Sequence, residues 1–135
     1  MRLYAILRSD IQMSWGKSIA QGGHAYQGAL AVAKRMSPEL HAAYTSVDVE
    51  TKLCLDGGSL DSLLSMYDRL IDRGIPAFLV IDKDHVEPPD FDGSEIVTAL
   101  GVGPISKRGA PSFLKKLPLW PGPRVLARLA EGGAP

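Results

Sequence analysis

The stretch Gly74-Ile75-Pro76-Ala77-Phe78-Leu79-Val80-Ile81-Asp82 joins a turn, five consecutive apolar residues and a carboxylate. A short apolar run that follows a Gly and Pro turn is typical of a β-strand buried on both faces. In open α/β sheets, ligands bind outside the carboxyl ends of the strands, and Asp82 lies at such an end. The stretch therefore predicts a buried strand that places an aspartate where a ligand would bind.

The residues before this strand predict a helix. Ser59 is a favourable N-cap, Gly74 is a favourable stop, and apolar side chains recur between them at spacings of three and four. These side chains are Leu60, Leu63, Leu64, Tyr67, Leu70 and Ile71. Further upstream, residues 51–55 predict a second strand that ends at Asp56-Gly57-Gly58.

The amino-terminal part of the chain predicts one strand and two helices. Leu3-Tyr4-Ala5-Ile6-Leu7 is a short apolar run that suits a buried strand. Residues 16–36 contain no proline and carry a helical stripe, which predicts a long helix that Ser37-Pro38 ends. A short second helix is expected over residues 38–44, because proline is well tolerated at a first helical position.

On the carboxyl side, residues 96–102 predict a fourth strand that ends at Gly103-Pro104. The element order β-α-β-α-β-β predicts an α/β sandwich with a four-stranded mixed, mostly parallel sheet flanked by helices. The length of 135 residues fits a single domain, which we expect to cover residues 1–120. The Pro- and Gly-rich stretch from residue 118 is expected to be peripheral, with residues 121–135 as a flexible tail.

The composition narrows the classes of function. A single cysteine, Cys54, excludes an intramolecular disulfide and a cysteine-based zinc site. The three histidines are widely spaced and the acidic residues do not follow an EF-hand pattern, so we expect no metal. The sequence has no apolar run of membrane-spanning length and lacks the features of a secretory signal. We therefore expect a cytoplasmic protein that does not contact membranes.

The net charge of zero hides a strong segregation of charge. Residues 1–36 carry five basic and one acidic side chain, and residues 105–135 carry six basic and one acidic side chain. Residues 37–104 carry 13 acidic and four basic side chains. This pattern is a weak indication of a polyanionic partner, and ordinary surface charge is the alternative. With such a partner, the basic ends should share a face with the site, and the acidic loop 82–95 should lie away from it.

Lys17, Gln21 and His24 share one face of the predicted helix 16–36, because they lie at spacings of four and three. An ammonium, an amide and an imidazole in one stripe suit a substrate site. At the helix start, free backbone N–H groups add to the charge of Lys17 and favour an anion. The alternatives are a solvated lysine and a buried, hydrogen-bonded histidine.

Gly22-Gly23 lies in the middle of the same predicted helix. Two glycines in a helix interior cost about 1–2 kcal/mol relative to alanine. We therefore expect a close approach at this point, either by a strand or by a ligand.

Asp82 and Lys17 are expected at the same edge of the sheet, because the loop after the first strand leads to Lys17. A Lys–Asp pair can activate a water molecule and stabilise an oxyanion. The plainer interpretations are that Asp82 begins an acidic turn and that Thr98 is a residue that favours strands.

Taken together, these residues resemble the archaeal and eukaryotic-type (type 2) peptidyl-tRNA hydrolase family over roughly residues 1–120. The matching blocks are Leu7-Arg8-Ser9-Asp10-Ile11-Gln12-Met13, Gly16-Lys17 with Ile19-Ala20-Gln21 and His24-Ala25, Thr51-Lys52-Leu53, the helix 60–73, Gly74-Ile75-Pro76, the strand into Asp82, and Thr98-Ala99-Leu100-Gly101-Val102-Gly103-Pro104. The resemblance implies an enzyme of translation that hydrolyses the ester between a stalled peptide and the 3′ end of tRNA. It implies no metal and no cofactor, and it suggests a homodimer.

The resemblance also implies roles for single residues. Lys17, Asp82 and Thr98 match the family's catalytic cluster, and Gln21 matches a neighbouring active-site position. Asp82 would polarise the attacking water, and Lys17 would stabilise the oxyanion or the leaving ribose oxygen. Gln21 and Thr98 would position the water or the acyl group. The substrate-binding positions within the matched motif are Arg8, Gly16 and His24.

Two departures from the family pattern bear on activity. The family aspartate is usually followed by Ala-Gly-Arg-Thr, whereas Asp82 is followed by Lys83-Asp84-His85-Val86, so a threonine hydroxyl is absent. The loop 82–95 is also longer and strongly acidic, and carboxylates near a phosphate path repel tRNA. The alternative function is therefore a catalytically impaired family member that binds RNA or a protein.

Overall fold

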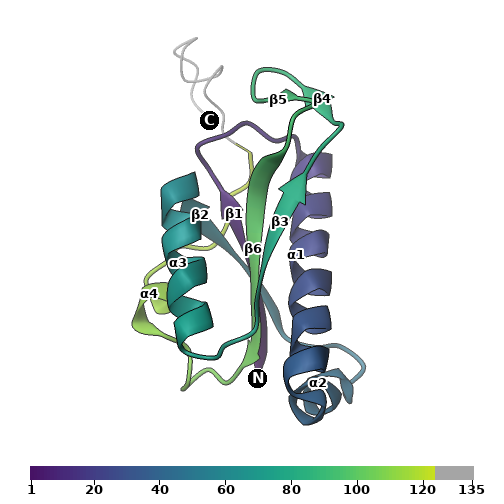
Figure 1. Cartoon of the computed structure of the whole chain (residues 1–135), viewed down its shortest axis with the longest axis vertical. Helices are drawn as coiled ribbons and strands as arrows, with labels where there is room; N and C mark the ends of the chain where they lie inside the picture. Colours follow the sequence, from purple (N-terminus) through teal and green to yellow (C-terminus); the bar gives the residue numbers. More distant parts are fainter. Residues whose placement is uncertain (124–135) are drawn as a thin grey trace.

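The computed structural model describes residues 1–123, which form a four-stranded sheet with helices on both faces (Figure 1). In chain order the elements are β1 (Arg2–Arg8), α1 (Trp15–Met36), α2 (Pro38–Thr45), β2 (Lys52–Gly58), α3 (Leu60–Asp72), β3 (Ala77–Asp82), β4 (Val86–Glu87), β5 (Phe91–Asp92), β6 (Ile96–Ile105) and α4 (Ser112–Lys115). The strand order across the sheet is β2-β1-β6-β3. The short strands β4 and β5 pair with each other in a separate hairpin.

The strand directions confirm the predicted mixed sheet. β1 pairs parallel with β2 and antiparallel with β6, and β6 pairs antiparallel with β3. Thus β1, β2 and β3 run in one direction, and β6 runs in the other. Three of the four strands therefore point the same way, as "mostly parallel" predicts. Of the three pairings between neighbouring strands, however, only β1–β2 is parallel.

The prediction that the apolar run 77–81 is buried on both faces is wrong. β3 is an edge strand, and its side chains Phe78 and Ile81 are exposed. The run is apolar because helices pack on both faces of the sheet at this strand. Leu79 contacts the core between the sheet and α3, and Val80 belongs to the core between the sheet and α1. The strand that is buried along its length is β1, which lies between β2 and β6.

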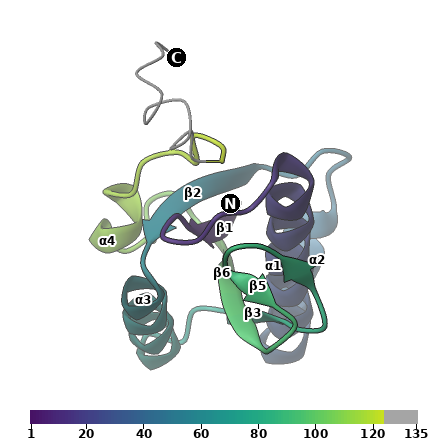
Figure 2. The ribbon, with the colours of Figure 1, turned by 90° about the horizontal axis from the view of Figure 1, so that it is seen from above.

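Two layers of helices cover the sheet: α1 and α2 lie on one face, and α3 and α4 lie on the other (Figures 1 and 2). Successive residues of β1 serve these two layers in turn, as the two-residue period of a strand requires. Tyr4 and Ile6 pack in the core with α3, while Ala5 and Leu7 pack in the core with α1. Within residues 1–123, no helix has the length and apolar character needed to cross a membrane.

α1 begins at Trp15, one residue before the predicted start. Ser14 is its N-cap, and the Ser14 hydroxyl accepts a hydrogen bond from the backbone N–H of Lys17 (3.1 Å). The helix lies close to β6, since a Cβ atom at Gly101 would be 2.0 Å from the carbonyl oxygen of Ala25. This close approach fixes the first three turns of α1 above the sheet.

The fourth predicted strand continues further than expected. β6 passes through Gly103-Pro104 to Ile105, because β1 continues to pair with it as far as Arg2. Gly103 adopts a φ of 107°, and a Cβ atom there would lie 2.8 Å from the carbonyl oxygen of Arg2. The glycine therefore permits a bend within the strand instead of marking its end.

The chain was predicted to be peripheral from residue 118 onward, and this prediction is wrong for Leu119 and Trp120. Leu119 forms an antiparallel bridge with Leu55 of β2, and the backbone N–H of Trp120 donates to the carbonyl oxygen of Cys54 (2.9 Å). This segment covers the outer edge of β2, which would otherwise be free to pair with another chain. Of the predicted flexible tail, residues 124–135 lie outside the described part of the chain.

Candidate active site

The first turn of α1 and the carboxyl end of β3 meet at one end of the sheet. There the Nζ atom of Lys17 forms an ion pair with Oδ2 of Asp82, so the two side chains lie at one edge as predicted. The Lys17 side chain is 9% exposed and the Asp82 side chain is 21% exposed. The Lys17 ammonium also lies 4.8 Å from the centre of the Phe91 ring, in a cation–π contact. The pair is thus largely shielded from water and remains accessible from one side.

A cleft of about 370 Å³ opens over this ion pair. It is formed by the start of α1, the end of β3 and the loop that follows β3. The lining residues are Ser14, Gly16, Lys17, Ala20, Gln21, His24, Asp82, His85 and Glu87. The structure therefore brings five of the seven predicted site positions into one cleft, and the two exceptions are Thr98 and Arg8.

Thr98 lies beneath the cleft. It is buried on β6, and its Oγ1 donates a hydrogen bond to Oε1 of Gln21, which is also buried. Because this bond occupies the amide oxygen, the N–H groups of Gln21 are the ones left to face the cleft. Thr98 thus orients Gln21 and has no place in the lining itself.

Arg8 lies outside the cleft, and its guanidinium is already engaged. It contacts Asp10 through two hydrogen bonds (2.8 and 3.0 Å), and it donates a third to the carbonyl oxygen of Val97 (3.0 Å). The hydrogen bond from Arg8 lowers the pKa of the Asp10 carboxyl below its usual value. Arg8 therefore ties the loop after β1 to the strand that carries Thr98.

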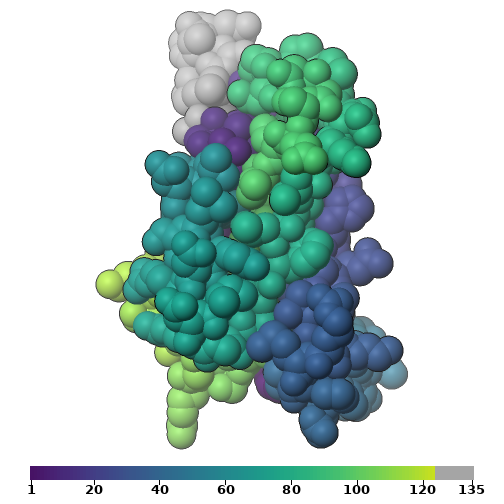
Figure 3. All heavy atoms as spheres, in the orientation of Figure 1, coloured from purple at the N-terminus to yellow at the C-terminus, as the bar shows by residue number. Residues whose placement is uncertain are grey.

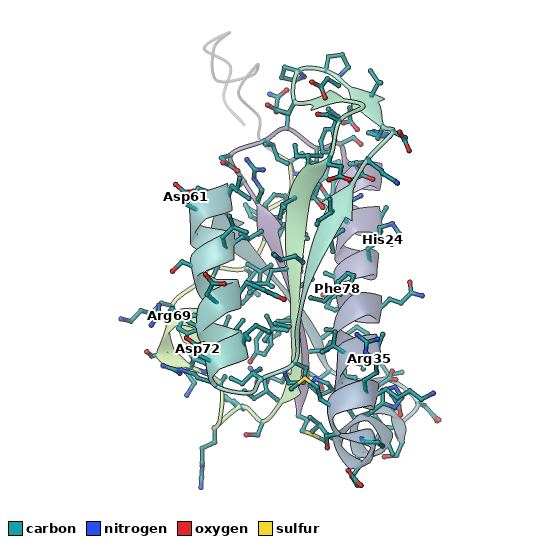
Figure 4. All side chains as sticks on the ribbon, in the orientation of Figure 1. His24, Arg35, Asp61, Arg69, Asp72 and Phe78 are labelled. Carbon is teal, nitrogen blue, oxygen red and sulfur yellow. The ribbon has the colours of Figure 1, made fainter. Side chains whose placement is uncertain are left out.

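Gly16 and His24 lie at the two ends of the α1 face that borders the cleft. Gly16 is the second residue of α1, where a backbone N–H has no partner within the helix and can donate to a bound group. His24 is exposed, and Figure 4 shows it on α1, across the sheet from Arg69 and Asp72 of α3.

The loop after β3 supplies cleft residues that the sequence analysis missed. His85 Nε2 lies 3.2 Å from Glu87 Oε2, and the His85 ring meets the Phe91 ring edge-on at 5.5 Å. Partial burial alone would raise the pKa of Glu87, but hydrogen bonds from the backbone N–H of Ser14 and from His85 lower it overall. No periodicity and no motif pointed to His85 and Glu87. The only sign in the sequence was that the residues after Asp82 depart from the family pattern.

The acidic loop lies at the site, so the prediction that it lies away from the site is wrong. It forms a cap at one end of the molecule (Figure 3), and its carboxylates accept hydrogen bonds from the loop before α1. Asp90 accepts from the backbone N–H of Gln12 (2.7 Å), and Glu87 accepts from that of Ser14 (2.9 Å). These carboxylates hold the cap against the start of α1.

Four basic side chains of the two ends gather elsewhere, although Lys17 lines the cleft, so the expected shared face is wrong for these four. Arg2, Lys107, Arg108 and Lys115 surround a hollow of about 750 Å³ between β1, β2 and α4. Arg2 begins β1 whereas Asp82 ends β3, and these strands run in the same direction. The basic hollow and the cleft therefore lie toward opposite ends of the sheet.

Comparison with known proteins identifies the family. Residues 1–120 match the sequence model of the family described as Peptidyl-tRNA hydrolase PTH2. The chain belongs to this family. A peptidyl-tRNA hydrolase of Methanothermobacter thermautotrophicus is 32% identical over 104 residues, which cover 77% of this chain and 86% of the relative. That of Methanocaldococcus jannaschii is 29% identical over 106 residues, with the same coverage. A protein of Dictyostelium discoideum named "Probable peptidyl-tRNA hydrolase 2" is 30% identical over 115 residues, which cover 85% of this chain and 52% of the relative.

Val86, where the chain departs from the PTH2 family pattern, lies outside the cleft. Val86 is 70% exposed on β4 and does not line the cleft. Its neighbours His85 and Glu87 do line it. In this member of the PTH2 family, an imidazole and a carboxylate thus stand beside the ion pair, and the change to valine removes no group from the observed lining.

The PTH2 cleft combines a cation, a carboxylate and an oriented amide around one accessible space. Asp82 can accept a hydrogen bond from a water molecule, and Lys17 can stabilise negative charge that develops next to it. Within residues 1–123, no group of three His, Cys, Asp or Glu side chains is arranged to hold a metal ion. The chemistry that these side chains support is attack of water on a carbonyl group.

Proposed function

We propose that this chain hydrolyses the ester bond between a peptide, or an N-blocked aminoacyl group, and the 3′ end of tRNA. Membership of the PTH2 family supports the reaction. The Lys17–Asp82 ion pair in an accessible cleft is the observation that carries the assignment of the site. In the reaction, water adds to the ester carbonyl carbon, the bond to the ribose oxygen breaks, and that oxygen leaves with a proton as a hydroxyl group.

Asp82 and Lys17 take the central roles. The Asp82 carboxylate accepts a proton or a hydrogen bond from the attacking water, which increases the nucleophilicity of the water. The Lys17 ammonium has three N–H donors and uses one of them for Asp82, so it can also donate to the oxyanion or to the leaving ribose oxygen. The pairing therefore holds both groups in place without blocking their action.

The other predicted residues support these two. The N–H groups of Gln21 hold the water or the acyl oxygen, and Thr98 acts as a positioning residue through its hydrogen bond to Gln21. His24 and the backbone N–H of Gly16 contact the substrate at the two ends of the cleft. Arg8 acts on the substrate indirectly, because its contacts hold the loop beside β6.

Hydrolysis of N-acetyl-aminoacyl-tRNA under multiple-turnover conditions tests this function. We expect Lys17→Ala and Asp82→Asn each to lower kcat at least about 100-fold, which is the usual scale for losing a catalytic base or an oxyanion donor. Lys83→Ala and Asp84→Asn are matched controls, because both residues are exposed in the same loop and neither lines the cleft. If all four variants keep the wild-type rate, the site is wrong. If the wild type binds tRNA in a salt-sensitive manner but cleaves no ester, the impaired-member alternative is correct.

A location in the cytoplasm, a role in translation and a homodimer belong to the same proposal. A substrate of the translation apparatus supports the first two, and the resemblance of the sequence to its family supports the third. Sedimentation equilibrium on the full chain checks the dimer, since a mass of 14.5 kDa would correspond to a monomer.

A further inference from the structure

A pocket separate from the cleft and from the basic hollow lies on the opposite side of α1 from the cleft. It is a pocket of about 280 Å³, and Trp15, Ser18 and Gly22 of α1, Cys54 of β2, and Trp120 contribute to its walls. Its volume is close to the lower end of the range of small-molecule sites, about 300–1,000 Å³. The segment that pairs with the outer edge of β2 closes the pocket on one side. In this segment Gly122 adopts a φ of 97°, and a Cβ atom there would be 2.4 Å from the Trp15 ring.

Two residues that line this pocket each carry a buried polar atom without a hydrogen-bond partner. The atoms are Oγ of Ser18 and Nε1 of Trp120, and within residues 1–123 they are the two buried side-chain atoms left in this state. Ser18 is 3% exposed, so the Ser18 hydroxyl is withdrawn from bulk water. Buried polar groups in folded proteins are almost always hydrogen-bonded. The exposed lining of the pocket is apolar, with the hydroxyl and the indole N–H buried in its walls, so it fits a ligand that has a flat apolar face and a polar edge to supply the missing partners.

The Gly22-Gly23 pair also lacks an explanation within the protein. A Cβ atom at either position would have no protein atom within 4 Å. By contrast, a Cβ atom at Gly28 would be 2.0 Å from the Phe78 ring, so packing accounts for that glycine. The sequence predicted the approach of a strand or a ligand at Gly22-Gly23, and a side chain at either position would point into open space.

We infer that this pocket binds a nucleobase of the unpaired 3′ end of the tRNA, and the inference rests on the proposed function. The aromatic rings of Trp15 and Trp120 suit a base, since bases stack on aromatic side chains and use their edges for hydrogen bonds. Trp15 is 64% exposed, so its ring is available to a ligand. An aliphatic side chain of the peptide could not satisfy Ser18 and Trp120.

The position of the pocket suits a base next to the nucleotide that carries the ester. The cleft and the pocket flank the same first turns of α1, and a helix with its side chains is about 10–12 Å wide. A single strand that crosses the start of α1 would pass Trp15 and Gly16, whose backbone N–H groups have no partner within the helix. The cleft would then hold the ester while the pocket holds the base.

Intrinsic fluorescence reports on this pocket directly, because the chain has two tryptophans and both line it. Titration of the full chain with the trinucleotide CCA, which carries no ester, should change this fluorescence to saturation. Gly22→Leu should weaken that binding at least about ten-fold, since leucine fills the pocket where no protein atom now lies. Ala42→Leu is the matched control, because it adds the same side chain at an exposed site on α2 and should leave the binding unchanged.

A kinetic experiment gives a second test. Trp15→Ala should raise KM for N-acetyl-aminoacyl-tRNA about ten-fold or more, as expected for the loss of a stacked base, and should change kcat little. Trp15→Phe should retain most of the affinity. The inference is overturned if CCA leaves the fluorescence unchanged, if Gly22→Leu binds CCA like the wild type, or if N-acetyl-leucinamide binds there and CCA does not. Saturable CCA binding without ester hydrolysis would support the pocket and contradict the proposed function.

Discussion

The two sides of α1 differ in what they present to a substrate. The side toward β3 carries the charged groups, with Lys17 paired to Asp82 in an open cleft. The side toward β2 carries Trp15 and the glycine pair, and its buried polar atoms have no partner. Because 3.6 residues complete one turn, a few neighbouring positions in the sequence can serve both sides. The comparison indicates that one helix separates the reacting groups from a recognition pocket.

The largest expected effect is on the charged side, where the ion pair should act as a unit. Lys17→Ala and Asp82→Asn should each lower kcat/KM by about 10²–10⁴, the combined range for loss of acid–base catalysis or an oxyanion donor. The double variant should be little worse than either single variant, because residues that work as a unit are strongly non-additive. Single-turnover kinetics on all three variants measures this coupling.

A double variant whose loss equals the product of the two single losses would show that Lys17 and Asp82 act independently. A second double-mutant cycle, with Trp15→Ala and Asp82→Asn, compares one residue on each side of α1. Those two changes should multiply, because recognition in the pocket and chemistry in the cleft involve different parts of the substrate.

The charged side could largely be predicted from the sequence. The carboxyl end of an apolar strand and the start of the following helix meet by general rules of α/β sheets, which placed Asp82 and Lys17 at one edge. The spacing of Lys17, Gln21 and His24 gave a shared helix face. By contrast, His85 and Glu87 reach the cleft through a hairpin whose path depends on tertiary hydrogen bonds, and no local pattern encodes such contacts.

The pocket side could be predicted only in part. Gly22-Gly23 indicated that something approaches the helix, but the sequence did not show which side of α1 is open. Trp120 reaches the pocket because its segment pairs with the edge of β2, and a stretch rich in Pro and Gly gave no sign of this. The strand order was equally hidden, since the apolar run of β3 looks central and lies at an edge.

A large effect is also expected for Cys54, which lies in the wall of the pocket. Burial raises the pKa of its thiol to about 11, so the reactive thiolate is scarce near neutral pH. At pH 8 its reaction with iodoacetamide should therefore be about 100-fold slower than that of a thiol with an ordinary pKa. The rate should keep rising as the pH approaches 11, and mass spectrometry of the labelled chain measures it. Labelling at pH 8 as fast as in the urea-unfolded chain would show that the pocket wall is open to water.

An intermediate effect is expected for Thr98 beneath the cleft. Thr98→Val keeps the shape but leaves the buried amide oxygen of Gln21 without a donor, which costs about 1–3 kcal/mol of unfolding free energy. Because Gln21 then loses its orientation, we expect kcat to fall about ten-fold with KM nearly unchanged. Thr98→Ser should restore kcat. Thr45→Val removes a hydroxyl of the same kind far from the cleft, where it donates to the carbonyl oxygen of His41, and should leave kcat unchanged.

The smallest expected effect compares the same substitution on the two sides of α1. Gly23→Ala should raise the unfolding free energy by about 0.8–1 kcal/mol, since it removes a helix-interior glycine and meets no protein atom within 4 Å. Gly28→Ala gains the same helix propensity but forces a methyl group against the Phe78 ring, and overpacking typically costs about 1–3 kcal/mol. Urea unfolding of the two variants should therefore give shifts of opposite sign. Equal shifts would mean that Phe78, which is exposed at the sheet edge, moves aside without cost, and that α1 is as loosely packed toward β3 as toward the pocket.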